Sequence, residues 1–222
     1  MFAEKQSNKK ISEAVNVSQN TMDKFRVDRD MVKTWEDEGI SWEVMQRFDV
    51  RYDDFSNRIV YPIRDASGAI RNVGGRTLDT DWKEKGLRKY TYFYKWGGAM
   101  DLLYGLYENY NDIVSSREII LFEGCKSVLK AQSWGINNTA AVLTSHISPN
   151  QLSILISLGA KVVVAFDNDV DVSKDYNMRK LLNYTRVDVI HDKDHVLEEK
   201  DSPVDKGEAV FRKLYEERRR LK

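Results

Sequence analysis

The sequence predicts an α/β protein in two parts, a mixed α+β subdomain followed by a subdomain built on a mainly parallel sheet. Two observations predict this fold class. Around residues 58–77, β-rich segments flank a Ser-Gly turn signal, which is typical of an antiparallel hairpin. From Arg117 onward, short apolar segments rich in Val, Ile and Leu alternate with helical patterns, which indicates βαβ units and a buried parallel sheet.

The composition bounds the classes of partner and cofactor. Thirty-five basic and 35 acidic residues give a net charge of zero, which argues against nucleic-acid binding through bulk charge. Residues 58–95, however, hold nine Lys and Arg against four Asp and Glu, which predicts a phosphate-binding face. The single cysteine, Cys125, excludes an intrachain disulfide, and no Cys/His cluster offers a zinc site. Without an export signal or a long apolar run, we expect a cytoplasmic protein with no membrane partner.

The first part of the chain divides into an arm and a helical segment. We expect residues 1–29 to form a polar N-terminal arm, because they show no clear amphipathic period. An N-terminal basic subdomain is expected over residues 30–115. Its apolar residues between Met31 and Phe48 are spaced as in two short helices with a turn at Gly39.

The hairpin and its continuation come next. Residues 58–64 and 69–76 predict its two strands, and Pro62 favours an edge position or a bulge. We expect the aromatic and basic residues 87–98 to be irregular. A helix is expected to begin near Leu103.

The parallel part is expected over residues 116–200, followed by a C-terminal helical segment over residues 201–222. No internal repeat interrupts the alternation of strands and helices. Strands are predicted at 119–122, 139–143, 161–166 and 186–190, and helices at 126–134, 149–158 and from about 174.

Three acidic residues follow directly after predicted strands. Glu123 ends the first strand of this part, and Asp167 and Asp169 end the third. In an open α/β sheet, ligands bind beyond the carboxyl ends of the strands, so these carboxylates are expected to converge. Oxygen ligands of this kind suit a hard divalent ion that neutralises phosphate. The alternative is that the aspartates only cap the helix that follows.

The motifs that carry these acids resemble a known fold. Residues 121–124 read LFEG, and residues 165–169 read AFDND, about 40 residues later. A strand ending in Glu-Gly and a later strand ending in Asp-x-Asp are similar to the TOPRIM fold of DnaG-type primases, type IA and II topoisomerases, and some nucleases. The resemblance implies that residues 116–200 form a Rossmann-like TOPRIM subdomain.

Upstream motifs resemble DnaG-type primases in particular. They occur in that family's usual order, and the resemblance covers the chain from about Asp30 to its C-terminus. The five upstream motifs are RIVYPIRD (58–65), GGRTL (74–78), KY (89–90), YKWG (94–97) and LYGLYE (103–108). Downstream, GIN (135–137) and KDSP (200–203) also resemble the family.

The resemblance implies a DNA primase catalytic core that makes short RNA primers on single-stranded DNA from ribonucleoside triphosphates. Glu123, Asp167 and Asp169 are then the catalytic residues, and with Asp201 they hold two or more Mg²⁺ or Mn²⁺ ions. Arginines in a hairpin are often only a solvated face, so Arg58 and Arg64 are open to that second interpretation. The implied template- and nucleotide-binding residues are Arg58, Arg64, Arg76, Lys89, Tyr90 and Lys95.

The chain also departs from the family pattern. Ser127 stands where the family usually has an aspartate, and Asn168 stands where it usually has a glycine. A second family acid near Asp201 is out of register unless Asp205 replaces it. These changes suggest a divergent member from a phage or plasmid. Neither a zinc ribbon nor a helicase-docking domain is recognisable, so a replicative helicase and a separate zinc-ribbon subunit are expected partners.

Other functions stay open from the sequence alone. A TOPRIM nuclease would use the same acids to hydrolyse a phosphodiester, although the upstream motifs argue against it. A catalytically weak, primase-like scaffold that binds single-stranded DNA in a replication complex is the other alternative, and Ser127 favours it. A topoisomerase is disfavoured, because no domain with a catalytic tyrosine accompanies the acids.

Overall fold

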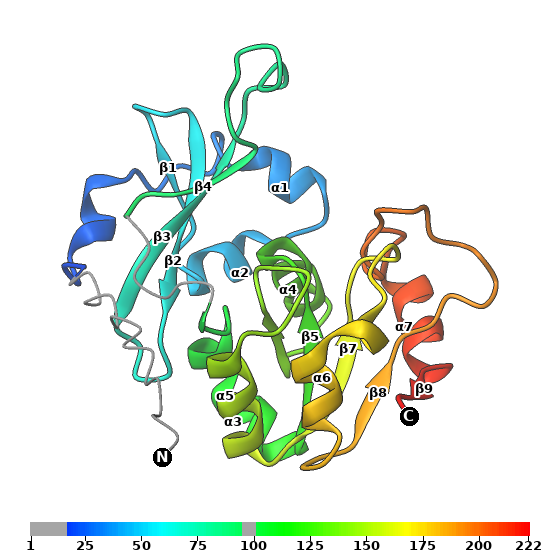
Figure 1. Cartoon of the computed structure of the whole chain (residues 1–222). Helices are drawn as coiled ribbons and strands as arrows, with labels where there is room; N and C mark the ends of the chain where they lie inside the picture. Colours follow the sequence, from blue (N-terminus) through cyan, green and yellow to red (C-terminus); the bar gives the residue numbers. More distant parts are fainter. Residues whose placement is uncertain (1–16, 95–100) are drawn as a thin grey trace, which may run out of the picture.

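The structure, a computed structural model, describes residues 17–94 and 101–222. Two sheets form its framework (Figure 1). The first has four strands in the order β1-β2-β3-β4, all antiparallel, and the second has five in the order β6-β5-β7-β8-β9. Every pairing in the second sheet is parallel except that of β8 with β9. The predicted fold class is confirmed.

The antiparallel sheet contains the predicted hairpin. Its strands are β1 (Arg51–Asp53), β2 (Arg58–Arg64), β3 (Ile70–Thr77) and β4 (Tyr90–Tyr92). At the β2–β3 turn, Asp65 accepts hydrogen bonds from the backbone N–H groups of Ser67 (2.9 Å) and Ala69 (3.1 Å). Pro62 lies beyond the residues of β2 that pair with β1, just before a register shift at Ile63 and Arg64. Proline is tolerated there, because no second strand needs its missing N–H.

Two helices precede this sheet as predicted, α1 (Lys33–Asp37) and α2 (Trp42–Arg47). The described part of the N-terminal arm expected over residues 1–29 packs on the sheet. Residues 21–24 form a 3₁₀ turn, η1 (Thr21–Lys24), and Val17, Met22 and Phe25 are buried against Val60 and Val73 of the sheet. A single turn of this kind has too few residues to display a helical period in the sequence.

The second sheet alternates with helices. Its parallel strands are β5 (Glu118–Phe122), β6 (Thr139–Ala141), β7 (Lys161–Ala165) and β8 (Val187–Val189). The helices are α3 (Leu106–Ser116), α4 (Cys125–Ser133), α5 (Pro149–Leu158), η3 (Val172–Lys174), α6 (Tyr176–Leu181) and α7 (Glu208–Glu216).

The C-terminal segment is not only helical, which corrects our expectation for residues 201–222. After α7 the chain forms β9 (Arg219–Arg220), which adds antiparallel to β8. The expected irregular stretch is also partly wrong, because Tyr90–Tyr92 pair with β3 as strand β4. The boundaries that we predict at residues 30, 116 and 201 stay predictions.

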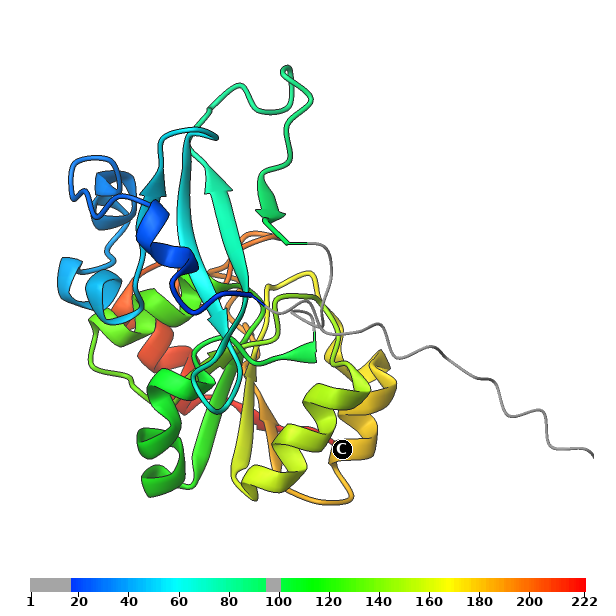
Figure 2. The ribbon, with the colours of Figure 1, turned by 90° about the vertical axis from the view of Figure 1, so that its left-hand side faces the viewer.

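The two sheets share one apolar core. Trp35 of α1, Tyr61 of β2 and Tyr104 lie in ring contact, with centroids 6.0 and 5.4 Å apart along the series. The same cluster continues to Val128 of α4 and Phe211 of α7. Figure 2 shows the antiparallel sheet standing above the end of the parallel sheet from which α4 departs.

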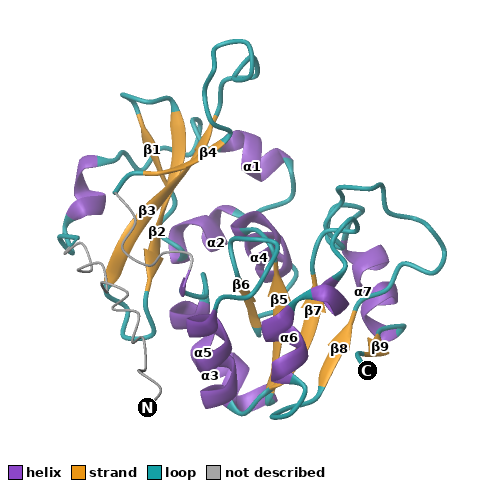
Figure 3. Ribbon diagram, viewed as in Figure 1, coloured by secondary structure: helices purple, strands orange, loops and turns teal. Residues whose placement is uncertain are grey.

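Polar contacts reinforce this packing. The backbone N–H of Ser41 donates to Ser133 Oγ (2.8 Å), and Arg47 donates to Gln132 Oε1 (2.9 Å). Both contacts join the α1–α2 segment to α4. Figure 3 shows α2 beside α4. Among the described residues, no helix is both long enough and apolar enough to cross a bilayer.

Candidate active site

Two neighbouring strands deliver the predicted acids to the same edge of the sheet. β5 and β7 are paired in parallel, with Phe122 opposite Ala165. Glu123 and Asp167 therefore emerge together at the carboxyl ends. Both line a cleft of about 340 Å³. The opposite wall comes from the antiparallel sheet and includes Lys89, Tyr90 and Tyr92.

The acids of the cleft carry negative charge that their surroundings do not balance. Glu123 Oε2 is buried and has no hydrogen-bond partner among the residues that the structure describes. Burial, and then the charge of Asp169, raise the pKa of Glu123 above its ordinary value. Burial also raises the pKa of Asp167 to about 7, and the carboxylates of Glu123, Asp205, Asp169 and Asp201 add to the shift. Such a set of mutually repelling oxygen donors favours a bound cation.

The donor set is chemically suited to a hard divalent ion. All of the acids offer carboxylate oxygens, the ligands that Mg²⁺ and Mn²⁺ prefer, and Glu123 has an oxygen without a partner. Within residues 17–94 and 101–222, no three His, Cys, Asp or Glu side chains are already gathered closely enough to hold one ion. Binding would therefore draw together carboxylates that now lie apart.

Asp201 is engaged by other groups in this structure. Its carboxylate accepts the backbone N–H of Glu198 (2.9 Å) and pairs with Lys206 (2.8 Å), and these contacts lower its pKa. It does not line the cleft, whereas Asp205 does. A ligand role for Asp201 stays a prediction.

The position of Ser127 is neutral and closed. Ser127 is buried, and its Oγ lies 2.9 Å from Ser202 Oγ. Next to this pair, Asp205 accepts hydrogen bonds from Lys130 Nζ (2.9 Å) and from the backbone N–H of Ser202 (2.9 Å). The wall around Ser127 is therefore held by hydrogen bonds and contains no unpaired carboxylate among the residues just named.

The basic and aromatic residues of β3 and β4 face the acids. Lys89 lines the cleft, and burial together with the charges of Arg76 and Lys83 lowers its pKa. Arg76 lies over the ring of Tyr90, 5.2 Å from the centroid, and its Nη1 is buried without a hydrogen-bond partner. Arg76, Lys89 and Tyr90 are thus brought together. Lys95 lies outside the described residues.

Two predicted template-binding arginines are placed elsewhere. Arg58 is 6% exposed, and its guanidinium donates to the backbone carbonyl of Arg88 at 3.0 Å. We correct our expectation for Arg58, because it supports the loop before β4 and is not free to bind phosphate. Arg64 pairs with Asp49 and Glu108, each at 3.5 Å, and does not line the cleft.

Several residues of the cleft were not found from the sequence. Tyr92, Lys126, Leu143, Lys200 and Ser202 also line it. The φ angle of Leu143 is 63°, in the left-handed region, and its N–H donates to the carbonyl of Glu123 at 2.8 Å. An isolated positive φ at a branched residue leaves no local sequence signal, although it is typical of functional sites. The one sign of a role for Leu143 is its place after β6, beside Glu123.

Known proteins similar to the chain include a prophage-derived protein and bacterial DNA primases. An uncharacterized SPbeta prophage-derived protein, YorJ of Bacillus subtilis, is 31% identical over 208 residues, which are 81% of this chain and 55% of that protein. The DNA primase of Halalkalibacterium halodurans is 35% identical over 120 residues, 54% of this chain and 19% of the primase. The chain thus spans about half of the first relative and about a fifth of the second.

Solved structures agree with these relatives. A DnaG primase catalytic domain bound to single-stranded DNA superposes with a TM-score of 0.65 at 19% identity, covering 90% of this chain and 76% of that domain. No protein-family model matches the chain. The sequence relatives and the fold nevertheless point the same way. The chain therefore has the DnaG-type primase fold and is a relative of bacterial DNA primases.

Proposed function

We propose that this chain is the RNA-polymerising core of a DNA primase. The observation that carries the proposal is the cleft itself, where Glu123 and Asp167 at the ends of β5 and β7 face Lys89 and Tyr90 of the antiparallel sheet. One wall suits a divalent cation, and the other suits phosphate and bases. This pairing is what nucleotidyl transfer on a single strand requires.

We assign the acids to metal-dependent transfer. Glu123, Asp167 and Asp169 would hold Mg²⁺ or Mn²⁺, which supplies charge neutralisation at the triphosphate when bound. The partnerless oxygen of Glu123 and the raised pKa of Asp167 support this assignment. The side chains orient the ribonucleotide so that its α-phosphate faces the primer 3′ hydroxyl. The number of ions, two or more, is part of the proposal.

The basic wall is proposed to hold the template. Arg76, Lys89 and Tyr90 combine charge with an aromatic face, and a solved DnaG catalytic domain with this fold binds single-stranded DNA. Lys95 is proposed for the same role from the sequence alone. A replicative helicase and a separate zinc-ribbon subunit are proposed as partners, as is a cytoplasmic location.

The test is RNA synthesis by the purified chain. It would be incubated with single-stranded DNA, labelled ribonucleotides, a dinucleotide primer and Mg²⁺ or Mn²⁺, beside Asp167→Asn. We expect short RNAs from the natural chain, and a loss of at least about 100-fold in Asp167→Asn, because a metal ligand is removed. Lys213→Gln is the matched control, since Lys213 is an exposed lysine that does not line the cleft, and it should retain activity.

Two other outcomes would contradict the proposal. Cleavage of the DNA that depends on Asp167, without RNA, would identify a nuclease. Binding of DNA with neither reaction would identify a scaffold. Both outcomes are read on the same gel when the DNA carries its own label.

A further inference from the structure

Lys126 is a basic residue on the acidic side of the cleft, and it lies outside the sequence motifs described above. It lies in the first turn of α4, three residues after Glu123, and it lines the cleft with Glu123 and Asp167. Its side chain is 21% exposed. Lys126 thus borders the space in which a metal-bound triphosphate would lie.

Lys126 is held by a weak partner from another element. Its Nζ forms an ion pair with Glu38, in the connection between α1 and α2, and the Glu38 side chain is 43% exposed. The Lys126 side chain is mostly buried, but the Glu38 carboxylate is open to water, which weakens the attraction between the two groups. A polyphosphate that enters the cleft can therefore take the ammonium from Glu38.

Lys130, one turn further along α4, provides the contrast. Its side chain is only 10% exposed, and its ammonium is fixed by Asp205 at 2.9 Å. Asp205 is fixed in turn by the N–H of Ser202. Lys130 is therefore part of the wall, whereas Lys126 is available to a ligand.

The cleft is lined by charges of both signs, with Lys89, Lys126 and Lys200 beside the carboxylates of Glu123, Asp167 and Asp205. Ser127, next to Lys126, is neutral and bonded to Ser202, and the exposed Lys200 lies in the same wall. Lys89 adds positive charge from the other side of the cleft. A nucleotide triphosphate has oxygens enough to meet a cation at Glu123 and Asp167 and an ammonium at Lys126.

We propose that Lys126 binds the phosphate groups of the incoming ribonucleotide, and that Glu38 holds its ammonium when the cleft is empty. This inference rests on the proposed function, because it takes the cleft to be the nucleotide site. Lys126 is then a binding residue that this chain supplies at the position next to Ser127. Glu38 acts through Lys126 and is a positioning residue.

The test is a double-mutant cycle on nucleotide affinity. The natural chain, Lys126→Gln, Glu38→Gln and the double variant would be titrated with GTP in Ca²⁺, without template, by calorimetry. We expect Lys126→Gln to raise the Kd for GTP about tenfold, the size of one charge-assisted hydrogen bond. Glu38→Gln should lower the Kd about threefold, because the ammonium is released. In the Lys126→Gln background, Glu38→Gln should have no further effect.

A matched control is Lys213→Gln, which removes an exposed lysine paired with Asp194 far from the lining of the cleft. It should leave the Kd unchanged. Equal affinity in all four chains, or a weakening by both single variants, would overturn the inference, since a purely structural ion pair would act in one direction. A loss of affinity for a single-stranded oligonucleotide, with GTP affinity unchanged, would instead assign Lys126 to the template backbone.

The measurement of RNA synthesis tests the proposed function independently of the role of Lys126. RNA synthesis with no effect of Lys126→Gln on the Kd or on the KM for ribonucleotides rejects the role of Lys126 alone. The expected pattern of GTP affinities without RNA synthesis rejects polymerisation but supports phosphate binding by Lys126.

Discussion

Asp167, which we propose as a metal ligand, lowers the stability of the metal-free protein near neutral pH. Burial and four neighbouring carboxylates raise its pKa to about 7 in the folded chain, from about 3.9 in an unfolded one. A carboxyl group whose pKa is higher in the folded chain than in the unfolded chain makes its full contribution to stability only at pH values below the unfolded pKa. That contribution is lost as the pH rises from about 4 through about 7. Near neutral pH, the site therefore costs stability unless a cation neutralises it.

We accordingly expect Asp167→Asn to stabilise the metal-free protein, and to do so more at pH 8 than at pH 5. Allowing for solvent screening of a partly exposed carboxyl, the gain at pH 8 is about 1–2 kcal/mol. Urea denaturation in EDTA at the two pH values measures it. Added Mg²⁺ should stabilise the natural chain more than the variant. An equal gain at both pH values would mean that packing, and not charge, is responsible.

Single residues also show what the sequence could predict of the site. Glu123 and Asp167 were predictable, because a strand end is a local feature and parallel neighbours share an edge. The roles of Arg58 and Lys126 were not, since they depend on contacts with Arg88 and Glu38. Both contacts join segments that lie far apart in the sequence, by 30 and 88 residues, so no local pattern encodes them.

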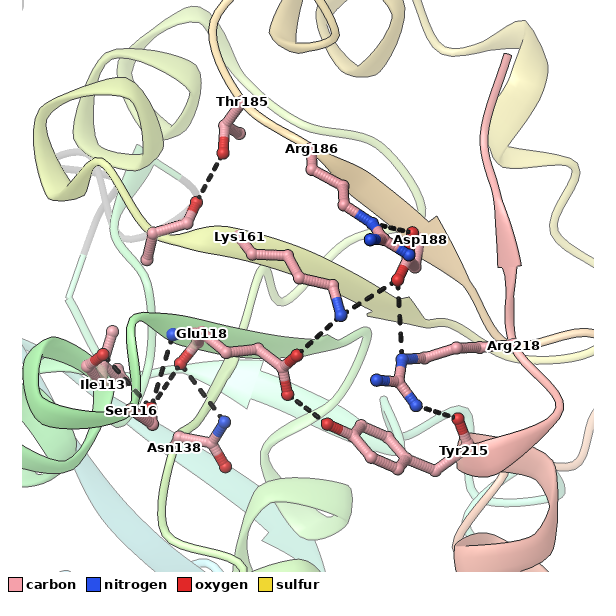
Figure 4. A network of polar contacts seen from close by, with 11 residues as sticks. Ile113, Ser116, Glu118, Asn138, Lys161, Thr185, Arg186, Asp188, Tyr215 and Arg218 are labelled. Atoms are coloured by element: carbon pink, nitrogen blue, oxygen red, sulfur yellow. Dashed lines mark hydrogen bonds and ion pairs between the residues drawn. The ribbon is translucent and has the colours of Figure 1, made fainter.

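At the scale of elements, an ion network joins the last strand to the rest of the sheet (Figure 4). Asp188 of β8 is 2% exposed at its side chain, and it pairs with Lys161 (3.0 Å), Arg186 (2.9 Å) and Arg218 (3.6 Å). Lys161 also pairs with Glu118 of β5 at 2.9 Å. The network thus joins β5, β7 and β8 to the turn between α7 and β9, at the end of the sheet opposite the acids.

We expect Asp188→Asn to destabilise the chain by about 3 kcal/mol, because it removes a buried carboxylate and leaves the partly buried Lys161 and Arg218 without this counter-charge. Burial alone would raise the pKa of Asp188, but hydrogen bonds from Arg186 and Lys161 lower it. The natural chain should therefore lose this stability only as the pH falls below about 4, through the folded pKa. Urea denaturation at neutral and acid pH measures both effects.

Arg186→Gln is the control for Asp188→Asn. The Arg186 side chain is 58% exposed, so its removal should cost less than about 1 kcal/mol. Equal losses of stability in Arg186→Gln and Asp188→Asn would show that the counter-charge of Asp188 to Lys161 and Arg218 is not the source of the stability.

The elements that escaped prediction share a physical feature. Strand β4 exposes Tyr90 and Tyr92, and β9 consists of Arg219 and Arg220, both exposed. Neither strand has a buried face, and neither flanks a Ser-Gly turn signal like the one that identified the hairpin. Both are held by backbone pairing to a neighbour, β3 or β8. The hairpin and the parallel strands were predictable because they bury their own side chains.

At the scale of the whole molecule, charge is balanced overall but segregated in the cleft. The net charge is zero, with 35 basic and 35 acidic residues. Arg76 and Lys89 lie on the antiparallel sheet, whereas the acids belong to the parallel sheet, and a common core holds the two sheets together. Binding to single-stranded DNA should therefore depend on a few placed contacts and not on the overall field of the protein.

Few phosphate contacts imply a shallow dependence of affinity on salt. Each contact with a single strand contributes about −0.7 to the slope of log K against log salt, so about three contacts predict a slope near −2. Lys89→Gln should reduce its magnitude by about 0.7, and Lys213→Gln, outside the cleft, should leave it unchanged. Fluorescence anisotropy of a labelled oligonucleotide over about 50 to 200 mM salt measures the slope. A steep slope that neither variant alters would mean that DNA binds elsewhere on the surface.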